Sequence, residues 1–122
     1  KPSSAASDVY KRQEVYRGSF AISVCPSENV ESPTIVGAQA ANELLNIIGI
    51  KASFVLTEYN DKIYISSRSI DEINVQIIME KLGGGGHLNV AGAQLEGVTI
   101  VQAKRMIQDT LDEMLKEGDI EE

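Results

Sequence analysis

The stretch Gly83-Gly84-Gly85-Gly86-His87 determines how the rest of this chain is organised. It lies between a helix-like run, 70–82, and a short apolar segment, 88–95. One glycine suits the end of a helix, where the C′ residue takes the left-handed conformation, and Gly83 fills that role. Three further glycines need another reason, because glycine loses more conformational freedom on folding than other residues do. A bare backbone followed by the only histidine of the chain suits a phosphate group.

A flexible hinge is the alternative interpretation of this loop. Glycine-rich linkers usually run longer and include serine. They do not usually stand between an apolar helix and an apolar strand. The sequence therefore favours an anion-binding loop over a hinge.

The composition indicates one soluble globular domain, and its charge indicates that any phosphate ligand should be small. The 122 residues are 43% hydrophobic and 24% charged. No run of 18 apolar residues and no signal-peptide core occurs, so we expect a cytoplasmic domain. The net charge of −7 would repel a long nucleic acid. A single cysteine, Cys25, is expected to be a buried small hydrophobe, and one histidine with one cysteine disfavours a zinc cluster.

Three segments are expected along the chain. Residues 1–14 are polar and aperiodic, and we interpret them as a linker or a non-native leader. Residues 15–118 carry the periodic apolar patterns of a folded domain. Residues 119–122 read as an acidic, solvated tail.

The first half of the domain predicts a strand, a helix and a hairpin. The run 20–24 is dense enough in apolar residues for a buried strand. Ser32 offers an N-cap before Pro33, and Gly49 is expected to end that helix. Strands are predicted at 50–57 and 63–67, with Asn60-Asp61 as their turn.

The second half predicts two helices around one more strand. Residues 69–72 fit a capping box that would begin a helix over 70–82. A short strand is predicted at 91–95, and residues 99–102 form a second capping box. The helix that follows carries an apolar stripe and should end at Gly118. The fold class is therefore α/β, with a mixed sheet of about four to five strands flanked by three helices.

Arg68 is the second candidate for a phosphate-binding group. It ends a predicted strand among serines 66, 67 and 69. The predicted helix of about 12 residues is roughly 18 Å long. Arg68 and His87 can therefore meet only if the loop folds back or the sheet brings the strand end round. A surface pair of Arg68 with Asp71 or Glu72 is the alternative, and His87 could instead donate to a backbone carbonyl.

The region around the loop resembles a known family. The matching residues are Ser66-Ser67-Arg68-Ser69, Asn74-Val75-Gln76, Met79-Glu80-Lys81-Leu82, the glycines with His87, and Val90-Ala91-Gly92. Together they resemble the DHH-associated substrate-binding domain of the DHH phosphoesterase superfamily. The finer pattern around the loop is most similar to the C-terminal domain of membrane-anchored cyclic-di-AMP phosphodiesterases. The resemblance covers residues 15–117.

The resemblance implies a division of labour between two domains. In the family, an upstream DHH domain carries the Asp-His-His motif and two manganese ions and hydrolyses the phosphodiester. No Asp-His-His occurs here, so no catalytic or metal-binding residue is expected in this chain and it should need no cofactor of its own. The implied partners are an adenine dinucleotide and that upstream domain, on the cytoplasmic side of the parent protein. The implied substrate-binding residues are Arg68, Ser69, Gly83, Gly84, Gly85, Gly86 and His87.

Other functions stay open at this point. A soluble oligoribonuclease (nanoRNase) or 3′,5′-bisphosphate phosphatase of the same superfamily shares the glycine loop. Those enzymes commonly place an aromatic residue after it, where this chain has Ala93. Alanyl-tRNA synthetases carry a related domain, but the acidic balance argues against tRNA binding. A non-catalytic interaction module, with a possible homodimer through the stripe of the last helix, is a second alternative.

Overall fold

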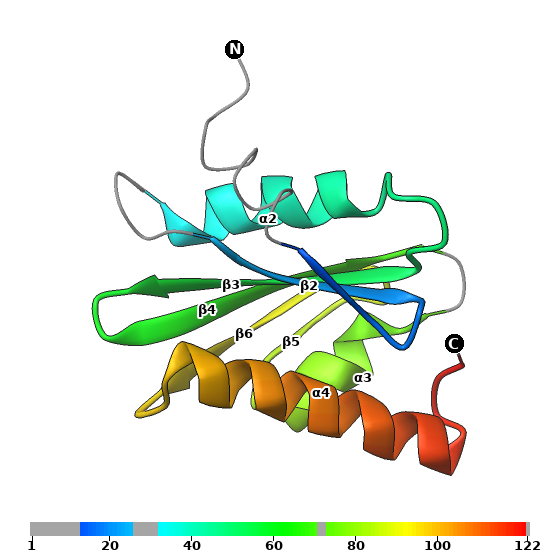
Figure 1. Cartoon of the computed structure of the whole chain (residues 1–122). Helices are drawn as coiled ribbons and strands as arrows, with labels where there is room; N and C mark the ends of the chain where they lie inside the picture. Colours follow the sequence, from blue (N-terminus) through cyan, green and yellow to red (C-terminus); the bar gives the residue numbers. More distant parts are fainter. Residues whose placement is uncertain (1–12, 26–31, 71–72, 122) are drawn as a thin grey trace.

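The computed structural model describes residues 13–25, 32–70 and 73–121. One mixed sheet lies between α2 on one face and α3 with α4 on the other (Figure 1). The fold class predicted from sequence is confirmed. The elements are β1 (Glu14–Tyr16), β2 (Phe20–Cys25), α2 (Pro33–Leu44), β3 (Ala52–Tyr59), β4 (Lys62–Ser69), α3 (Val75–Lys81), β5 (Gly85–Gly86), β6 (Val90–Glu96) and α4 (Ile100–Glu117).

The sheet has six strands in the order β1-β2-β3-β4-β6-β5. Strands β2 and β3 are parallel and joined by α2, and all other neighbours are antiparallel. The strands that were not individually predicted are β1 and β5, of three and two residues, which bring the sheet to one strand more than the expected four to five. Both are too short for a periodic apolar pattern, so only their pairing defines them. β1 begins at Glu14, the last residue of the expected leader.

Two apolar clusters hold the layers together. The larger one packs β-sheet side chains against α3 and α4 and includes Phe54, Ile78 and Leu111. The smaller one packs α2 against β2 and β3 through Ala40, Ala41 and other small or aliphatic residues. Cys25 is buried in this second cluster, as expected. Small residues on α2 let the helix lie close to the sheet.

Three predictions can be compared with the structure: the two ends of α2 and the turn between β3 and β4. The Ser32 hydroxyl accepts a hydrogen bond from the Ile35 amide at 3.4 Å, so the predicted N-cap is confirmed. The predicted end at Gly49 is wrong, because α2 stops at Leu44 and the chain continues in tighter i→i+3 turns. Asn60 and Asp61 both have positive φ, which confirms the hairpin turn.

The predicted capping box at 69–72 is wrong. Ser69 is the last residue of β4, and Asp71 and Glu72 lie outside the described residues. Helix α3 begins later, at Val75, where the Asn74 side chain accepts from the Gln76 and Ile77 amides. Strand pairing of Ser69 outcompetes its capping role, because Ser69 lies opposite Ala52 of β3 and its amide donates to the Asn89 carbonyl at 3.1 Å. Helix α3 has seven residues, where about 12 were expected, and is therefore about 10 Å long.

The last helix and the chain end agree with the sequence only in part. The capping box of Thr99 and Gln102 is confirmed, and Gly118 ends α4 in the left-handed conformation. The expectation of a solvated tail is wrong for Ile120, which is 5% exposed and belongs to the larger core cluster. The Asp119 amide donates to the Met114 carbonyl at 2.9 Å, which turns the chain back toward the core.

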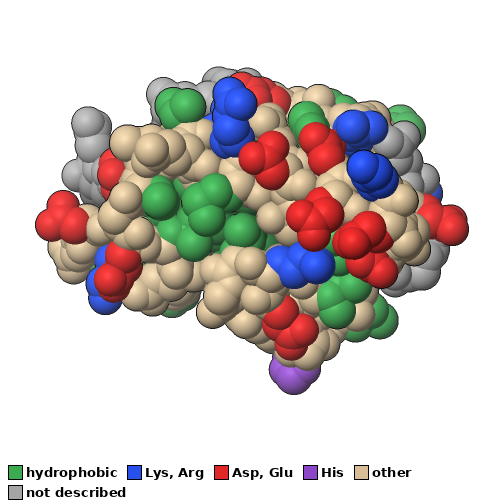
Figure 2. Space-filling view, turned by 90° about the horizontal axis from the view of Figure 1, so that it is seen from below, with side chains coloured by type: hydrophobic (Ala, Val, Ile, Leu, Met, Phe, Trp, Pro, Cys, Tyr) green, Lys and Arg blue, Asp and Glu red, His purple; other side chains and the backbone are tan. Residues whose placement is uncertain are grey.

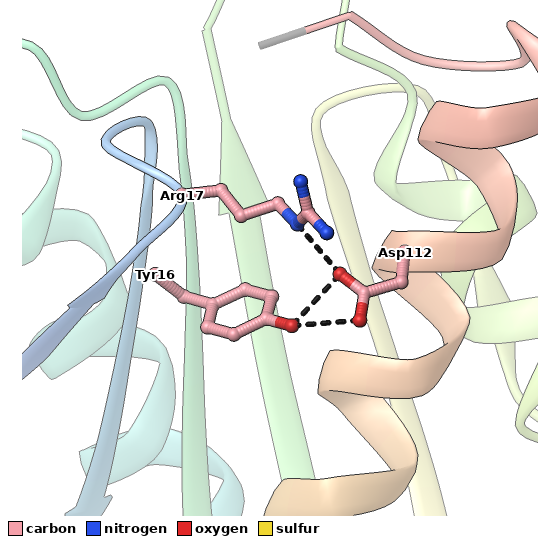
Figure 3. Close-up of polar contacts among 3 residues, drawn as sticks. All are labelled: Tyr16, Arg17 and Asp112. Carbon is pink, nitrogen blue, oxygen red and sulfur yellow. Dashed lines mark hydrogen bonds and ion pairs between the residues drawn. The ribbon is translucent and has the colours of Figure 1, made fainter.

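Strand β1 is attached to α4 by polar side chains (Figure 3). The Tyr16 hydroxyl donates to Asp112, with oxygen separations of 2.7 and 2.8 Å, and Arg17 Nε donates to Asp112 at 2.7 Å. Lys104 of α4 and Glu14 of β1 form a second contact at 2.9 Å.

In the part of the chain that the structure describes, no helix is both long and apolar enough to cross a membrane.

Candidate functional site

The candidate site is a hollow of about 590 Å³ on the α2 face of the sheet. Helix α2 packs on β2, β3 and β4 and leaves β6 and β5 uncovered on that side. The hollow lies beside α2, next to the part of the sheet that this helix covers. Its lining comes from α2, β4, the glycine loop and β6: Thr34, Tyr64, Ile65, Ser66, Arg68, Gly83, Gly84, Gly85, Gly86, His87, Val90, Ala91, Gly92, Ala93 and Gln94.

The glycine loop is an ordered part of the sheet. Gly83 has φ +87°, and the amides of Gly83 and Gly84 donate to the carbonyls of Glu80 and Met79. This pattern is a Schellman motif, and it confirms the predicted role of Gly83. Gly85 and Gly86 then pair with β6 as β5. The pairing disfavours the hinge interpretation.

Three of the four glycines are required by the fold itself. Gly83 and Gly86 have positive φ, at +87° and +144°. A Cβ on Gly84 would lie 2.1 Å from the Gly92 carbonyl oxygen, and one on Gly86 would lie 2.5 Å from that of Val90. Gly85 differs from these three. It has no positive φ, and a Cβ built there meets nothing within 4 Å. Gly85 therefore leaves bare backbone on the hollow without a structural need for glycine.

Arg68 reaches the hollow from the end of the β4–β6 ladder, where it lies opposite Val90. Its Nη1 donates to the Ser67 carbonyl at 2.8 Å, which orients the guanidinium. Partial burial lowers the pKa of Arg68 below its usual value, but the group stays charged. Among the described residues no carboxylate pairs with it. The alternative pairing with Asp71 or Glu72 lies outside the described residues.

His87 reaches the same hollow from the turn between β5 and β6. Its amide donates to the Val90 carbonyl at 2.7 Å, and the Val90 amide donates back at 3.3 Å. The side chain is exposed and makes no hydrogen bond to the described part of the chain. Because Val90 also lies opposite Arg68, the sheet brings Arg68 and His87 together. That is one of the two routes left open by the sequence.

Ser69 is the predicted site residue that does not line the hollow. It is 6% exposed, and its hydroxyl donates to the Ile73 carbonyl at 2.6 Å. The same oxygen accepts a hydrogen bond from the Asn89 side-chain amide at 2.9 Å. Ser69 thus ties the end of β4 to the segment that follows His87. Its contact with a ligand would be indirect.

Several lining residues were not among the sequence predictions. Tyr64 and Ser66 lie on the same face as Arg68, because they occupy alternate positions of β4. The sequence carried no signal that this face would stay uncovered, nor that Gln94 on β6 and Thr34 on α2 would join it. The missing signal is the antiparallel pairing of β4 with β6.

The lining chemistry suits binding of an anion. Arg68 and His87 are the cationic or cationisable side chains, glycine amides stand beside them, and the lining contains no carboxylate or thiol. Within residues 13–25, 32–70 and 73–121, no group of three His, Cys, Asp or Glu side chains could hold a metal ion. The described residues therefore do not fit a manganese site.

The sequence model of the DHHA1 domain matches residues 18–117. The chain belongs to the DHHA1 family. This DHHA1 domain is 47% identical over 100 residues to the cyclic-di-AMP phosphodiesterase PdeA of Listeria monocytogenes, with 81% of the chain and 15% of that protein covered. It is 41% identical over 92 residues to the cyclic-di-AMP phosphodiesterase GdpP of Geobacillus thermodenitrificans, with 75% and 14% covered.

A more distant relative and a solved structure extend the comparison. The bifunctional oligoribonuclease and PAP phosphatase NrnA of Thermus thermophilus is 35% identical over 71 residues, covering 57% of this chain and 22% of NrnA. An exopolyphosphatase-related protein of Bacteroides fragilis has the same fold, with a TM-score of 0.80 at 21% identity. That match covers 93% of this chain and 36% of that chain. The chain thus spans about one seventh of the phosphodiesterases it matches.

Proposed function

We propose that this domain binds cyclic-di-AMP, or the linear di-adenylate made from it, as the substrate-binding part of a DHH-type phosphodiesterase. The observation that carries the proposal is Gly85, whose bare backbone faces the hollow although the fold does not require glycine there. A ligand that approaches the backbone closely is a reason for this glycine. An upstream DHH domain with manganese would supply the hydrolysis.

The arrangement of donors supports a phosphate ligand. Arg68 offers a planar fork that matches phosphate oxygens, and His87, whose backbone is hydrogen-bonded to Val90, offers a second donor on the same hollow. A hydrogen bond to a charged group contributes about 1.5–3 kcal/mol. Two such bonds beside backbone amides are sufficient to favour an anion over water. The proposal also agrees with the cyclic-di-AMP phosphodiesterases among the relatives.

The size of the site and the surface charge favour a small ligand. The hollow of about 590 Å³ lies within the range of small-molecule sites. On the α3–α4 face, acidic and basic side chains are intermixed and form no continuous basic track (Figure 2). With a net charge of −7, the chain offers little attraction to a long strand.

A short-RNA or bisphosphate substrate is the second candidate, and the match to NrnA favours it. The same hollow would hold the terminal phosphate of either ligand. The interaction-module alternative has less support, because Ala103, Ile107, Leu111 and Met114 of the α4 stripe are buried in the core. That stripe is not free for a partner.

Calorimetric titration of the purified chain with cyclic-di-AMP tests the proposal. Gly85→Ala should keep the thermal stability of the wild type and weaken binding about tenfold or more, because the methyl group occupies the ligand's approach. Gln39→Ala, an exposed change on α2 away from the hollow, is the matched control and should bind normally. Linear di-adenylate, adenosine 3′,5′-bisphosphate and a long oligonucleotide then compete against labelled cyclic-di-AMP. Absence of dinucleotide binding, or best competition by the long strand, contradicts the proposal.

A further inference from the structure

The floor of the hollow consists of three pairs of residues across the β4–β6 ladder. Paired residues in an antiparallel sheet share a face, and alternate pairs return to that face. The pairs on the hollow are Tyr64 with Gln94, Ser66 with Gly92, and Arg68 with Val90. The floor therefore has two ends and a middle.

The middle pair keeps the floor low. Ser66 is small, and Gly92 has no side chain. A Cβ on Gly92 would lie 2.8 Å from the Ile65 carbonyl oxygen, so strand packing excludes any larger residue there. Because Ser66 is buried against Gly37 of α2, a bound molecule would extend from the Arg68 end to the Tyr64 end over Gly92.

The two ends differ in their chemistry. The Arg68 end adjoins the glycine loop and His87 and is cationic. The other end, four residues along β4 or about 13 Å away, carries the neutral side chains of Tyr64 and Gln94. A nucleotide has the same polarity, with an anionic phosphate separated by a sugar from a neutral, planar base. A phosphate at Arg68 would direct the base toward Tyr64 and Gln94.

Gln94 has the hydrogen-bonding groups to distinguish purine bases. Its side chain is exposed, and its amide makes no hydrogen bond to the described residues. A glutamine amide pairs with adenine in a bidentate manner, because it accepts from N6 and donates to N7. Guanine presents two acceptors, O6 and N7, which an arginine or lysine satisfies and a glutamine does not. Tyr64, directly opposite, offers a half-buried ring for stacking.

We propose that Gln94 is the specificity-determining residue that selects adenine over guanine, with Tyr64 as the stacking surface beside it. The inference rests on the proposed function, since it assigns the base end of the same hollow. The Tyr64–Gln94 pair lies opposite the phosphate-binding end and contributes selectivity, while the Arg68 end contributes the charge-assisted grip.

The test is the ratio of affinities for cyclic-di-AMP and cyclic-di-GMP. The wild-type chain should prefer the adenine ligand, and Gln94→Ala should lower that preference by about fivefold or more, because one bidentate pair is lost. Gln94→Arg should move the preference toward guanine. Tyr64→Leu should weaken both ligands together, since stacking does not depend on base identity.

Control variants distinguish base recognition by Gln94 from dinucleotide binding by the domain as a whole. Gln39→Ala and Gln39→Arg make the same changes at an exposed position of α2 and should leave the affinity ratio unchanged. The arginine variant controls for the effect of an added positive charge. An unchanged ratio in both Gln94 variants, with wild-type binding intact, overturns the base-recognition inference and leaves the proposed function standing. Failure of the wild-type chain to bind either dinucleotide overturns both. Circular dichroism of each variant confirms that the comparison is between folded chains.

Discussion

Arg68 on β4 and Val90 on β6 lie directly opposite each other, and the Val90 carbonyl accepts the His87 amide at 2.7 Å. One residue thus links the two candidate phosphate donors. The distance between them in sequence is bridged by strand pairing and not by the helix between them.

Removal of either donor should weaken binding of cyclic-di-AMP while the fold is kept. Arg68→Ala and His87→Ala each lose a charge-assisted contact, so we expect about a tenfold loss in affinity for each. Calorimetric titration gives the affinity and thermal denaturation gives the stability. Arg105→Ala, an exposed arginine of α4, is the control. Equal affinity in wild type and both variants would count against this site.

Gly84→Ala should destabilise the domain, in contrast to Gly85→Ala. The new methyl group would meet the Gly92 carbonyl oxygen at 2.1 Å, so β5 must move away from β6. Overpacking of this kind costs about 1–3 kcal/mol. Gly85→Ala points its methyl group into open space and should stay within about 0.5 kcal/mol of wild type. Urea denaturation measures both, and equal stabilities would contradict the close packing.

The contact of Tyr16 with Asp112 should make stability depend on acid pH. The hydrogen bond from Tyr16 lowers the pKa of Asp112 below its usual value. Because the folded-state pKa is the lower one, the contribution is present above the unfolded pKa of about 4 and is lost as pH falls through the folded value. Asp112→Asn should therefore be less stable than wild type at pH 7, and the difference should shrink below pH 4.

Asp109→Asn is the control for this pH series, since Asp109 is an exposed residue of the same helix. Thermal denaturation between pH 2 and pH 8 (roughly two units below and four above the unfolded pKa) gives the comparison. A stability difference for Asp112→Asn that stays constant across the series would show that the lost contact is not electrostatic.

Ile120 should contribute to stability although it lies close to the chain end. It is 5% exposed and packs in the larger core cluster, so Ile120→Ala leaves a cavity. We expect a loss of about 2 kcal/mol in the free energy of unfolding. Glu121→Ala, its exposed neighbour, should have little effect. Equal denaturation midpoints for the two variants would indicate a solvated tail.

The chain alone should not hydrolyse cyclic-di-AMP when manganese is added. The described residues hold no cluster of three metal-ligating side chains, and the hollow has no carboxylate in its lining. Incubation with Mn²⁺, followed by chromatography of the nucleotide, measures turnover. Product formation that persists through repeated purification and disappears with Arg68→Ala would place the chemistry in this domain.

Local patterns predicted much of this fold. Capping at Ser32 and Thr99, the Asn60-Asp61 turn and the glycines at 83 and 118 were readable because each depends on a few neighbouring residues. The resemblance around the glycine loop likewise predicted the family. Ser69 shows the limit of such reasoning, because it fits a capping box locally but is taken by a strand.

The sequence by itself determined most of the helices and strands, the α/β class and the position of the glycine loop. These follow from side-chain periodicity and from backbone preferences within a few residues. Only the tertiary structure decided that β4 pairs with β6, that α2 leaves this pair uncovered, and that Gln94 joins Arg68 around one hollow. Such pairings join residues distant in the chain. Their free energy comes from burial and strand hydrogen bonding across the whole sheet, which no local pattern encodes.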